Sequence, residues 1–184
     1  MFRIRTRIYL NQRGLTLIEL LAAVMILVLI LSLAYPLLTF GVKTYGQSQT
    51  RSSLQDQVQL ASLAVTKLLR YASEASIETA ATCPTTLQTG YNYICVDSTD
   101  NSIKHIVYNV STNSFTSGPI VKDMSGKRSF TILFSKNATN AKLLNFDLTG
   151  QTSTQSYHIQ TELLIMNASA DIQGTSGFKV MKYK

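Results

Sequence analysis

The sequence contains only two cysteines, two histidines and few charged side chains. Two cysteines cannot form a four-thiolate zinc site, and no cysteine or histidine cluster has the spacing of zinc ligands. The histidines, His105 and His158, lie singly in strand-like segments. A G-x-S-x-G turn and a phosphate-binding glycine loop are both missing. We therefore expect no enzyme activity, no metal site and no cofactor.

Acidic residues are missing from the start of the chain, where basic residues gather. The net charge of +7 includes Arg3, Arg5, Arg7 and Arg13, and removing these four from the 17 basic residues leaves 13 against 10 acidic ones. A nucleic-acid-binding protein concentrates its positive charge on the folded domain. This distribution argues against a nucleic-acid partner without excluding one. The low charged fraction, 15%, is ordinary for a protein displayed outside a cell.

A long uncharged run begins after Glu19 and ends before Lys43. As a helix, residues 20–42 would extend about 34 Å at 1.5 Å per residue. The hydrocarbon core of a bilayer is roughly 30 Å thick. The run therefore predicts one membrane span, with Glu19 at its edge. The preceding arginines indicate a cytoplasmic N-terminus and an extracytoplasmic remainder.

The order of the basic, small and apolar residues differs from that of a secretory signal peptide. Such a peptide has its small-residue cleavage site after the apolar segment. Here the small residue, Gly14, precedes the apolar run. A cut between Gly14 and Leu15 would remove a basic leader, residues 1–14, and would leave the span on the mature chain. Glu19 would then be the fifth residue of that chain.

This arrangement resembles the class III signal of type IV prepilins and type II secretion pseudopilins. The matching residues are Arg13-Gly14, followed by Leu15-Thr16-Leu17-Ile18-Glu19-Leu20-Leu21. The resemblance implies that prepilin peptidase cuts after Gly14, that the new amine of Leu15 is methylated, and that Glu19 serves in assembly. Pro36 matches a proline that often interrupts the helix in this family. The chain departs from the family in beginning its mature part with Leu15 and in having Val28 where many members have glycine.

The physical cost of a carboxylate in lipid favours a partner for Glu19. Charged residues at the centre of a membrane helix cost about 2.5–3.5 kcal/mol, and they are usually paired and functional. The amine created at Leu15 is a suitable partner, and the family resemblance implies that it belongs to a neighbouring subunit. Such a pair would fix the axial register between helices, as a polar residue does in a coiled coil. The alternative is a solvated Glu19 in the headgroup region, without a partner.

Residues 43–80 are expected to continue the helix beyond the span of residues 15–42. Apolar residues recur there at spacings of four and three, which indicates an amphipathic stripe: Leu54, Val58, Ala61, Val65, Leu68 and Ala72. The stripe suits a coiled coil with another chain or packing on this protein's own sheet, and we favour the sheet. Because proline lacks an amide donor and clashes with the preceding turn, Pro36 predicts a kink near residues 32–36.

Residues 81–184 are expected to form an extracellular β-rich domain. β-Branched and aromatic runs separated by turn residues predict strands at residues 91–97, 103–110, 130–135, 142–148 and 157–167. Helix first and strands later predict an α+β fold in which a long N-terminal helix packs on an antiparallel meander, as the pilin resemblance also implies. Cys83 and Cys95 either form a disulfide in the exported domain or remain separate buried thiols. The oxygen-rich turn containing Asp97, Asp100 and Asn101 lacks the EF-hand pattern for Ca²⁺.

These features together predict a non-enzymatic filament subunit, namely a minor, tip-located or initiating type IV pilin. Its C-terminal segment, residues 161–184, is similar to that of minor pilins and J-type pseudopilins. The alternatives are a pseudopilin of a type II secretion or competence DNA-uptake system, and an anchored extracellular binding module that does not polymerise. Expected partners are prepilin peptidase, other pilin or pseudopilin subunits, the inner-membrane assembly platform and membrane lipid. The protein would be a single-pass membrane protein before assembly and part of a cell-surface filament afterwards.

Overall fold

The computed structural model describes residues 16–123 and 126–184. The chain divides into two compact units, Met1–Gln47 and Ser48–Lys184. Gly14 and Leu15, where cleavage and methylation are expected, lie outside the described residues.

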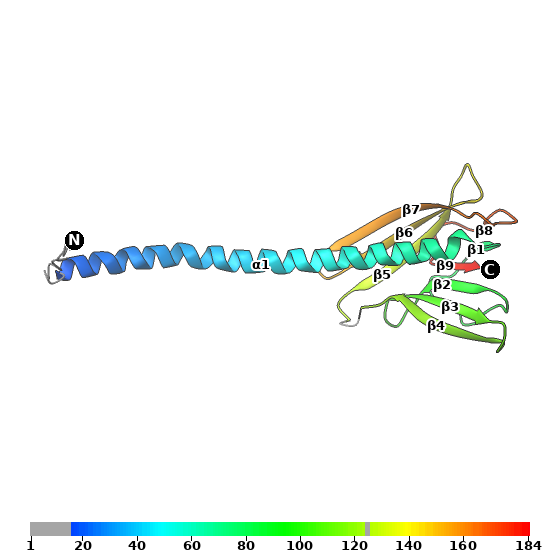
Figure 1. The fold of residues 1–184 in the computed structure, drawn as a ribbon, viewed down its shortest axis with the longest axis horizontal. Helices are drawn as coiled ribbons and strands as arrows, with labels where there is room; N and C mark the ends of the chain where they lie inside the picture. The colour runs from blue at the N-terminus through cyan, green and yellow to red at the C-terminus, as the bar shows by residue number, and fades with distance from the viewer. Residues whose placement is uncertain (1–15, 124–125) are drawn as a thin grey trace, which may run out of the picture. The chain divides into compact units, whose positions relative to one another are not determined.

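One α-helix, α1 (Leu17–Arg70), contributes to both units (Figure 1). The helix continues through Pro36, and the kink expected there stays a prediction. The predicted C-terminal end of the helix near residue 80 is wrong, because α1 ends at Arg70 and a strand begins at Ala75. Ala72 continues the apolar spacing of the helical stripe and is buried, but it lies in the turn after the helix. The spacing therefore predicts a helix that is too long. Lys67 and Arg70 occupy the last helical turn, where positive charge favours the helix dipole.

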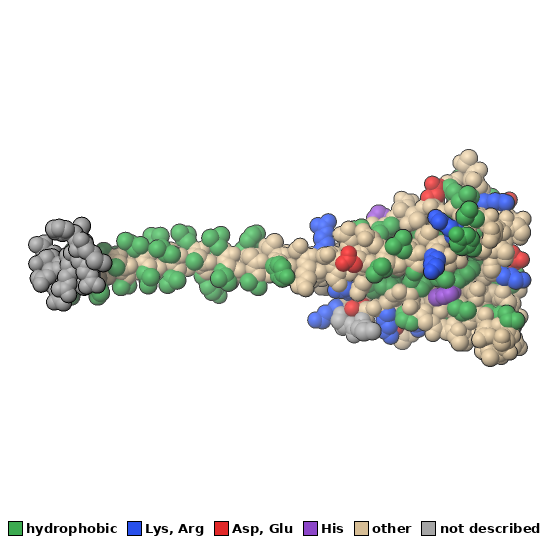
Figure 2. Space-filling view, in the orientation of Figure 1, with side chains coloured by type: hydrophobic (Ala, Val, Ile, Leu, Met, Phe, Trp, Pro, Cys, Tyr) green, Lys and Arg blue, Asp and Glu red, His purple; other side chains and the backbone are tan. Residues whose placement is uncertain are grey.

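Residues 20–42 of α1 have no charge, and hydrophobic side chains cover much of the side that Figure 2 shows. Among the described residues, α1 is the one helix long and apolar enough to cross a membrane. Its large hydrophobic side chains from Leu17 to Val42 are exposed within the single chain. A helix that is hydrophobic on all sides needs a surrounding of lipid or protein.

The second unit contains two β-sheets. The larger sheet has the strand order β4-β3-β2-β9-β1-β8, and all its neighbouring pairs are antiparallel except β1 and β8. The strands of this sheet are β1 (Ala75–Glu78), β2 (Asn92–Val96), β3 (Ile103–Asn109), β4 (Ser114–Val121), β8 (Gln173–Gly174) and β9 (Val180–Tyr183). The smaller sheet is the antiparallel meander β5 (Ser129–Lys136), β6 (Leu143–Gln151) and β7 (Ser156–Leu164).

The predicted single meander is therefore wrong in topology, although the α+β class and all five predicted strands are confirmed. The chain forms two short meanders that belong to different sheets. The last strand, β9, returns to lie between β1 and β2.

The core of the second unit lies between α1 and the two sheets (Figure 1). The buried stripe of α1 consists of Leu54, Val58, Ala61, Ser62, Val65 and Leu69. This burial confirms the predicted amphipathic stripe in α1. It differs at one position, since Leu69 is buried whereas the predicted Leu68 is half-buried. Phe130, Phe134 and Phe146 of the smaller sheet are fully buried in the same core. The stripe is covered by this protein's own sheets, so the coiled-coil alternative does not apply to it.

Gly150 of β6 allows α1 to approach the smaller sheet closely. A Cβ atom at this position would lie 2.6 Å from Cγ2 of Val58 and 3.0 Å from Cδ1 of Leu54. Both contacts are far shorter than a van der Waals distance, and both partners are fully buried. Glycine is therefore required here by packing rather than by a turn.

A second, smaller cluster lies on the other face of the larger sheet. It contains the buried side chains of Tyr93, Cys95, Ile106 and Val180. Residues from the segment between β1 and β2, including Cys83 and Leu87, pack against it. Cys83 and Cys95 form a disulfide, and the amide of Cys83 donates a hydrogen bond to the carbonyl of Val96 at 2.9 Å. The disulfide and this hydrogen bond together hold the irregular segment between β1 and β2 over one face of the sheet.

Candidate functional site

The first turn of α1 is closed by reciprocal hydrogen bonds between Thr16 and Glu19. The backbone amide and the hydroxyl of Thr16 both donate to Oε2 of Glu19, each at 3.0 Å. The amide of Glu19 points back toward Oγ1 of Thr16 at 3.4 Å. This is a capping box, in which a threonine N-cap and a glutamate three residues later satisfy each other's free amides.

The capping box leaves Glu19 able to bind a further group. Both bonds from Thr16 go to the same carboxylate oxygen, Oε2. The second oxygen, Oε1, can accept a hydrogen bond from an ammonium group, because an ionised carboxylate has about four acceptor sites. The arrangement fixes a negative charge at the start of an apolar helix and keeps one oxygen accessible.

The bonds of the capping box lie entirely within residues 16–19. A cut between Gly14 and Leu15 would therefore leave all of them intact. Thr16 has a structural role that the family resemblance does not assign to it. Its sequence signal is a threonine three residues before a glutamate at the start of an apolar run.

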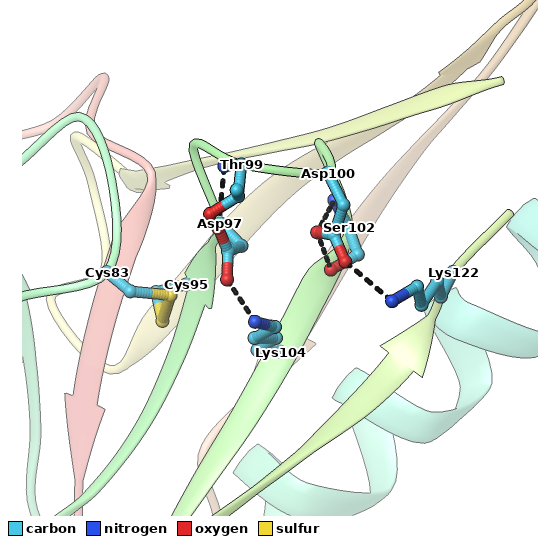
Figure 3. Close-up of polar contacts among 8 residues, drawn as sticks. All are labelled: Cys83, Cys95, Asp97, Thr99, Asp100, Ser102, Lys104 and Lys122. Carbon is cyan, nitrogen blue, oxygen red and sulfur yellow. Dashed lines mark hydrogen bonds and ion pairs between the residues drawn. A yellow bond between two sulfur atoms is a disulfide. The ribbon is translucent and has the colours of Figure 1, made fainter. Parts of the chain in front are cut away.

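The turn between β2 and β3 is organised by two ion pairs (Figure 3). Asp97 pairs with Lys104 and accepts from the amide and hydroxyl of Thr99 at 2.7 and 2.6 Å. Asp100 pairs with Lys122 at 2.9 Å and accepts from the hydroxyl of Ser102. The hydrogen bond from Lys104, followed by those from Thr99, holds the pKa of Asp97 well below its usual range. The hydrogen bonds from Ser102 and Lys122 lower the pKa of Asp100.

Both aspartates of this turn thus already have a lysine as counter-ion. In residues 16–123 and 126–184, no group of three His, Cys, Asp or Glu side chains has a geometry suited to a metal ion. We therefore interpret the turn as an internally neutralised hairpin connection. The pair of Asp100 and Lys122 could not be predicted from the sequence, because Lys122 follows β4, two strands further along the chain.

The two histidines do not lie together. His105 is on β3, and its Nε2 atom lies 2.5 Å from the hydroxyl of Tyr183 on β9. Burial lowers the pKa of His105 and raises that of Tyr183. Both pKa shifts favour neutral groups, and the imidazole and the phenol share one hydrogen bond whose donor is set by the tautomer of His105. His158 is on β7, with Nε2 at 3.5 Å from Asp147 of β6.

Comparison with known proteins adds to this geometry at two levels. The prokaryotic N-terminal methylation motif matches residues 9–35. Among solved structures, the PilB minor pilin from Streptococcus sanguinis is similar, with a TM-score of 0.56 and 12% identity over 73% of this chain and 34% of that chain. Its D319A mutant gives a TM-score of 0.59 and 11% identity over the same shares. A search of curated protein sequences gave no significant match.

The chain is thus similar to proteins with a prokaryotic N-terminal methylation motif over residues 9–35, and its fold is similar to that of a minor pilin. The similar solved structures are of a minor pilin. At 12% identity the structural likeness shows the fold alone, and this chain spans about a third of the length of the solved chains.

Proposed function

We propose that this protein is a structural, minor subunit of a type IV pilus. The observation that carries the proposal is the start of α1, where a capped, negatively charged first turn precedes an uncharged run, residues 20–42. An anchor that only holds a domain on a membrane does not need a carboxylate at this position. The pilin-like fold of the second unit supports the same function.

The proposed mechanism begins with insertion of the precursor, with its arginines on the cytoplasmic side. Prepilin peptidase then removes residues 1–14, and the amine of Leu15 is methylated. Glu19 enters the membrane with two hydrogen bonds from Thr16 on its carboxylate. During assembly, the amine of Leu15 on a neighbouring subunit binds the carboxylate of Glu19 and fixes the axial register of the two helices. The assembly platform moves α1 out of the lipid, and the β-rich unit is displayed on the filament surface.

The experiment that tests this function compares wild type with Gly14→Leu and Ser48→Leu in cells that produce filaments. The bulky residue at position 14 would block the cut, so Gly14→Leu should keep its leader, remain in the membrane fraction and be missing from sheared filaments. Ser48→Leu should behave as wild type, because Ser48 is exposed on α1 far from the junction. A wild-type protein that keeps its leader, or that never enters filaments, would refute the proposal.

A further inference from the structure

The two sheets of the second unit end in four edge strands within the described part of the chain, and two of these edges are protected by their own sequence. β8 has only two residues. β4 contains Gly118 and Pro119, and its pairing with β3 is irregular between Ile103 and Lys104. Short strands, prolines and bulges are the devices that keep a sheet edge from pairing with another chain.

The third edge, that of β5, is occupied by loops of the same chain. The amide of Phe130 donates to a carbonyl of the turn after β2 at 2.8 Å. The amide of Phe134 donates to the carbonyl of Phe178 at 2.9 Å, and the amide of Lys136 donates to the hydroxyl of Ser176 at 2.9 Å. Another strand could therefore not reach β5 without displacing these loops.

The fourth edge, that of β7, is long and regular. Its nine residues pair with β6 in an unbroken register and include no proline, glycine, lysine or arginine. At the two ends of this ladder, the amide of Thr152 donates to the carbonyl of Gln155, and the amide of Ile165 donates to the carbonyl of Lys142. Hydrogen-bonded and non-hydrogen-bonded pairs alternate along an antiparallel ladder. The residues of β7 whose backbones bond to β6 are therefore Tyr157, Ile159, Thr161 and Leu163.

The residues between these direct their backbone amides and carbonyls away from the sheet. His158, Gln160 and Glu162 lie in the middle of this row, and all three are exposed. Among residues 16–123 and 126–184, their amides have no hydrogen-bond partner. Figure 1 shows β7 as the outermost strand of the smaller sheet. An extended peptide that adds a strand to a sheet binds to backbone groups arranged in this way.

The side chains beside this edge are acidic. Glu162 is exposed, and Asp147 of β6 is paired with Gln160, so both carboxylates lie on the outer face of the smaller sheet. One oxygen of Glu162 accepts from the amide of the Asn137 side chain at 2.8 Å. Neither β6 nor β7 contains a lysine or arginine. Opposite charges on neighbouring strands attract each other, so this face favours a strand with basic side chains.

We propose that the outer edge of β7 binds an extended segment of a different protein, which adds a strand to the smaller sheet and carries lysine or arginine at alternate positions. The open backbone groups of β7 supply the hydrogen bonds, and Glu162 supplies the preference for basic side chains. A second copy of β7 does not fit this requirement, because it contains no lysine or arginine. The inference goes beyond the proposed pilus function and does not rest on it, since it depends only on the second unit.

Hydrogen exchange of the full chain in detergent is the first test. The probes are two nine-residue synthetic peptides, one alternating threonine with lysine and the other alternating threonine with glutamate. Without peptide, the amides of His158, Gln160 and Glu162 should exchange freely, whereas those of Ile159 and Thr161 should be protected by β6. The lysine peptide at millimolar concentration should slow exchange at the three outward amides at least tenfold, and the glutamate peptide should not. Failure of the lysine peptide to slow exchange, or equal slowing by both peptides, would overturn the proposal.

Variants of β7 provide the second test, with Gln160→Pro as the variant and Gln160→Ala as the matched control. Proline removes the outward amide, and an edge strand tolerates it where that amide faces solvent. Gln160→Pro should lose the protection given by the lysine peptide, and Gln160→Ala should keep it. Wild-type binding by a folded Gln160→Pro protein would overturn the proposal.

A charge reversal covers the case in which Gln160→Pro lowers the melting temperature, because Glu162→Lys leaves the backbone unchanged. This variant should bind the lysine peptide at least fivefold more weakly than wild type. Asp171→Lys is its control, since Asp171 is exposed in the segment before β8, and it should bind as wild type does. Equal binding by both variants would overturn the proposal and leave the pilus function intact, because peptide binding is measured on the purified chain. A protein that never enters filaments would refute the pilus function alone.

Discussion

The carboxylate of Glu19 accepts two hydrogen bonds from Thr16, one from its amide and one from its hydroxyl. Glu19, which we propose acts in assembly, is therefore also a member of the capping box at the start of its own helix. Two roles for one carboxylate can be separated by experiment, because capping needs an acceptor oxygen whereas pairing with an amine benefits from a negative charge.

Glu19→Gln and Glu19→Ala should both be processed normally and both fail to assemble. Glutamine keeps the acceptor oxygen and can replace glutamate in a capping box, but it has no charge with which to hold an amine. Incorporation into sheared filaments, measured by immunoblot relative to wild type, should fall at least tenfold for both variants. If Glu19→Gln assembles like wild type, capping alone explains the residue and the intersubunit pair does not exist.

Thr16→Val should loosen the first turn of α1, whereas Thr16→Ser should preserve it. Loss of an N-cap hydroxyl costs about 1 kcal/mol. Hydrogen exchange in detergent should therefore be about fivefold faster at the amides of Glu19 and Leu20. Equal protection in the valine and serine variants would show that the hydroxyl of Thr16 does not stabilise the turn.

Gly150→Ala should destabilise the second unit, because its Cβ would lie 2.6 Å from a fully buried Val58 methyl group. Forcing a methyl group into a packed core typically costs about 1–3 kcal/mol. Gly118→Ala is the matched control, since its Cβ would meet nothing within 4 Å. Thermal unfolding of the full chain in detergent should show a lower melting temperature for Gly150→Ala only. Equal melting temperatures for the two variants would contradict the close approach of α1 to β6.

Removing the disulfide should expose the smaller cluster of Tyr93, Cys95, Ile106 and Val180. In the chain-entropy estimate, a bond that closes a loop of this size contributes about 3 kcal/mol or somewhat less. The Cys83→Ser/Cys95→Ser double variant should unfold at lower denaturant concentration than wild type. Thiol alkylation of the exported protein should label both cysteines only after reduction, and labelling without reductant would contradict the pairing.

Acid should weaken the fold partly through Asp97. Its pKa is held low by the hydrogen bonds from Lys104 and Thr99, whereas in the unfolded chain an aspartate titrates near about 3.9. The pairing of Asp97 therefore contributes its full free energy of stabilisation above about pH 3.9. As the pH falls below that value, this contribution is lost, because the unfolded chain binds a proton more readily than the folded chain. Asp97→Asn should flatten the fall in unfolding free energy between about pH 5 and pH 2.

The control for this pH dependence is Asp56→Asn, which removes an exposed carboxylate of α1. This control variant should keep the wild-type slope of unfolding free energy against pH. A slope for Asp97→Asn that equals those of wild type and the control would contradict the ion pair.

The sequence indicated most of the helix but not its C-terminal end. The spacing of Leu54, Val58, Ala61 and Val65 is unambiguous for a buried helical face. Beyond Arg70, Ala72 and Ala75 are still buried, so apolar spacing alone cannot separate a turn and a short strand from another helical turn.

Four strands escaped prediction for physical reasons. β4 contains Gly118 and Pro119, which normally indicate a turn. The proline is tolerated in this strand because β4 lies at the edge of the sheet. β1, β8 and β9 have at most four residues each, which is too short for an alternating pattern. β9 also contains Lys182, so it resembles a basic tail, yet it lies inside the sheet and Lys182 pairs with Glu78 at 2.7 Å.

For the candidate site, the sequence drew attention to Glu19, which the structure places in a capping box, and to the Cys83–Cys95 disulfide, which is confirmed. The cut after Gly14 stays a prediction. The ion pair of Asp100 and Lys122 could not be found in this way, because it joins the turn after β2 to the residue that follows β4. These residues come together only through the sheet order, which no local pattern encodes.

The most direct test is the intact mass and N-terminal peptide of the protein taken from sheared, washed filaments. We expect a chain that begins at Leu15 and carries a methylated amine, present together with the other filament subunits. A chain that still includes residues 1–14, or its complete absence from filaments while it accumulates in the membrane, would contradict the proposed function.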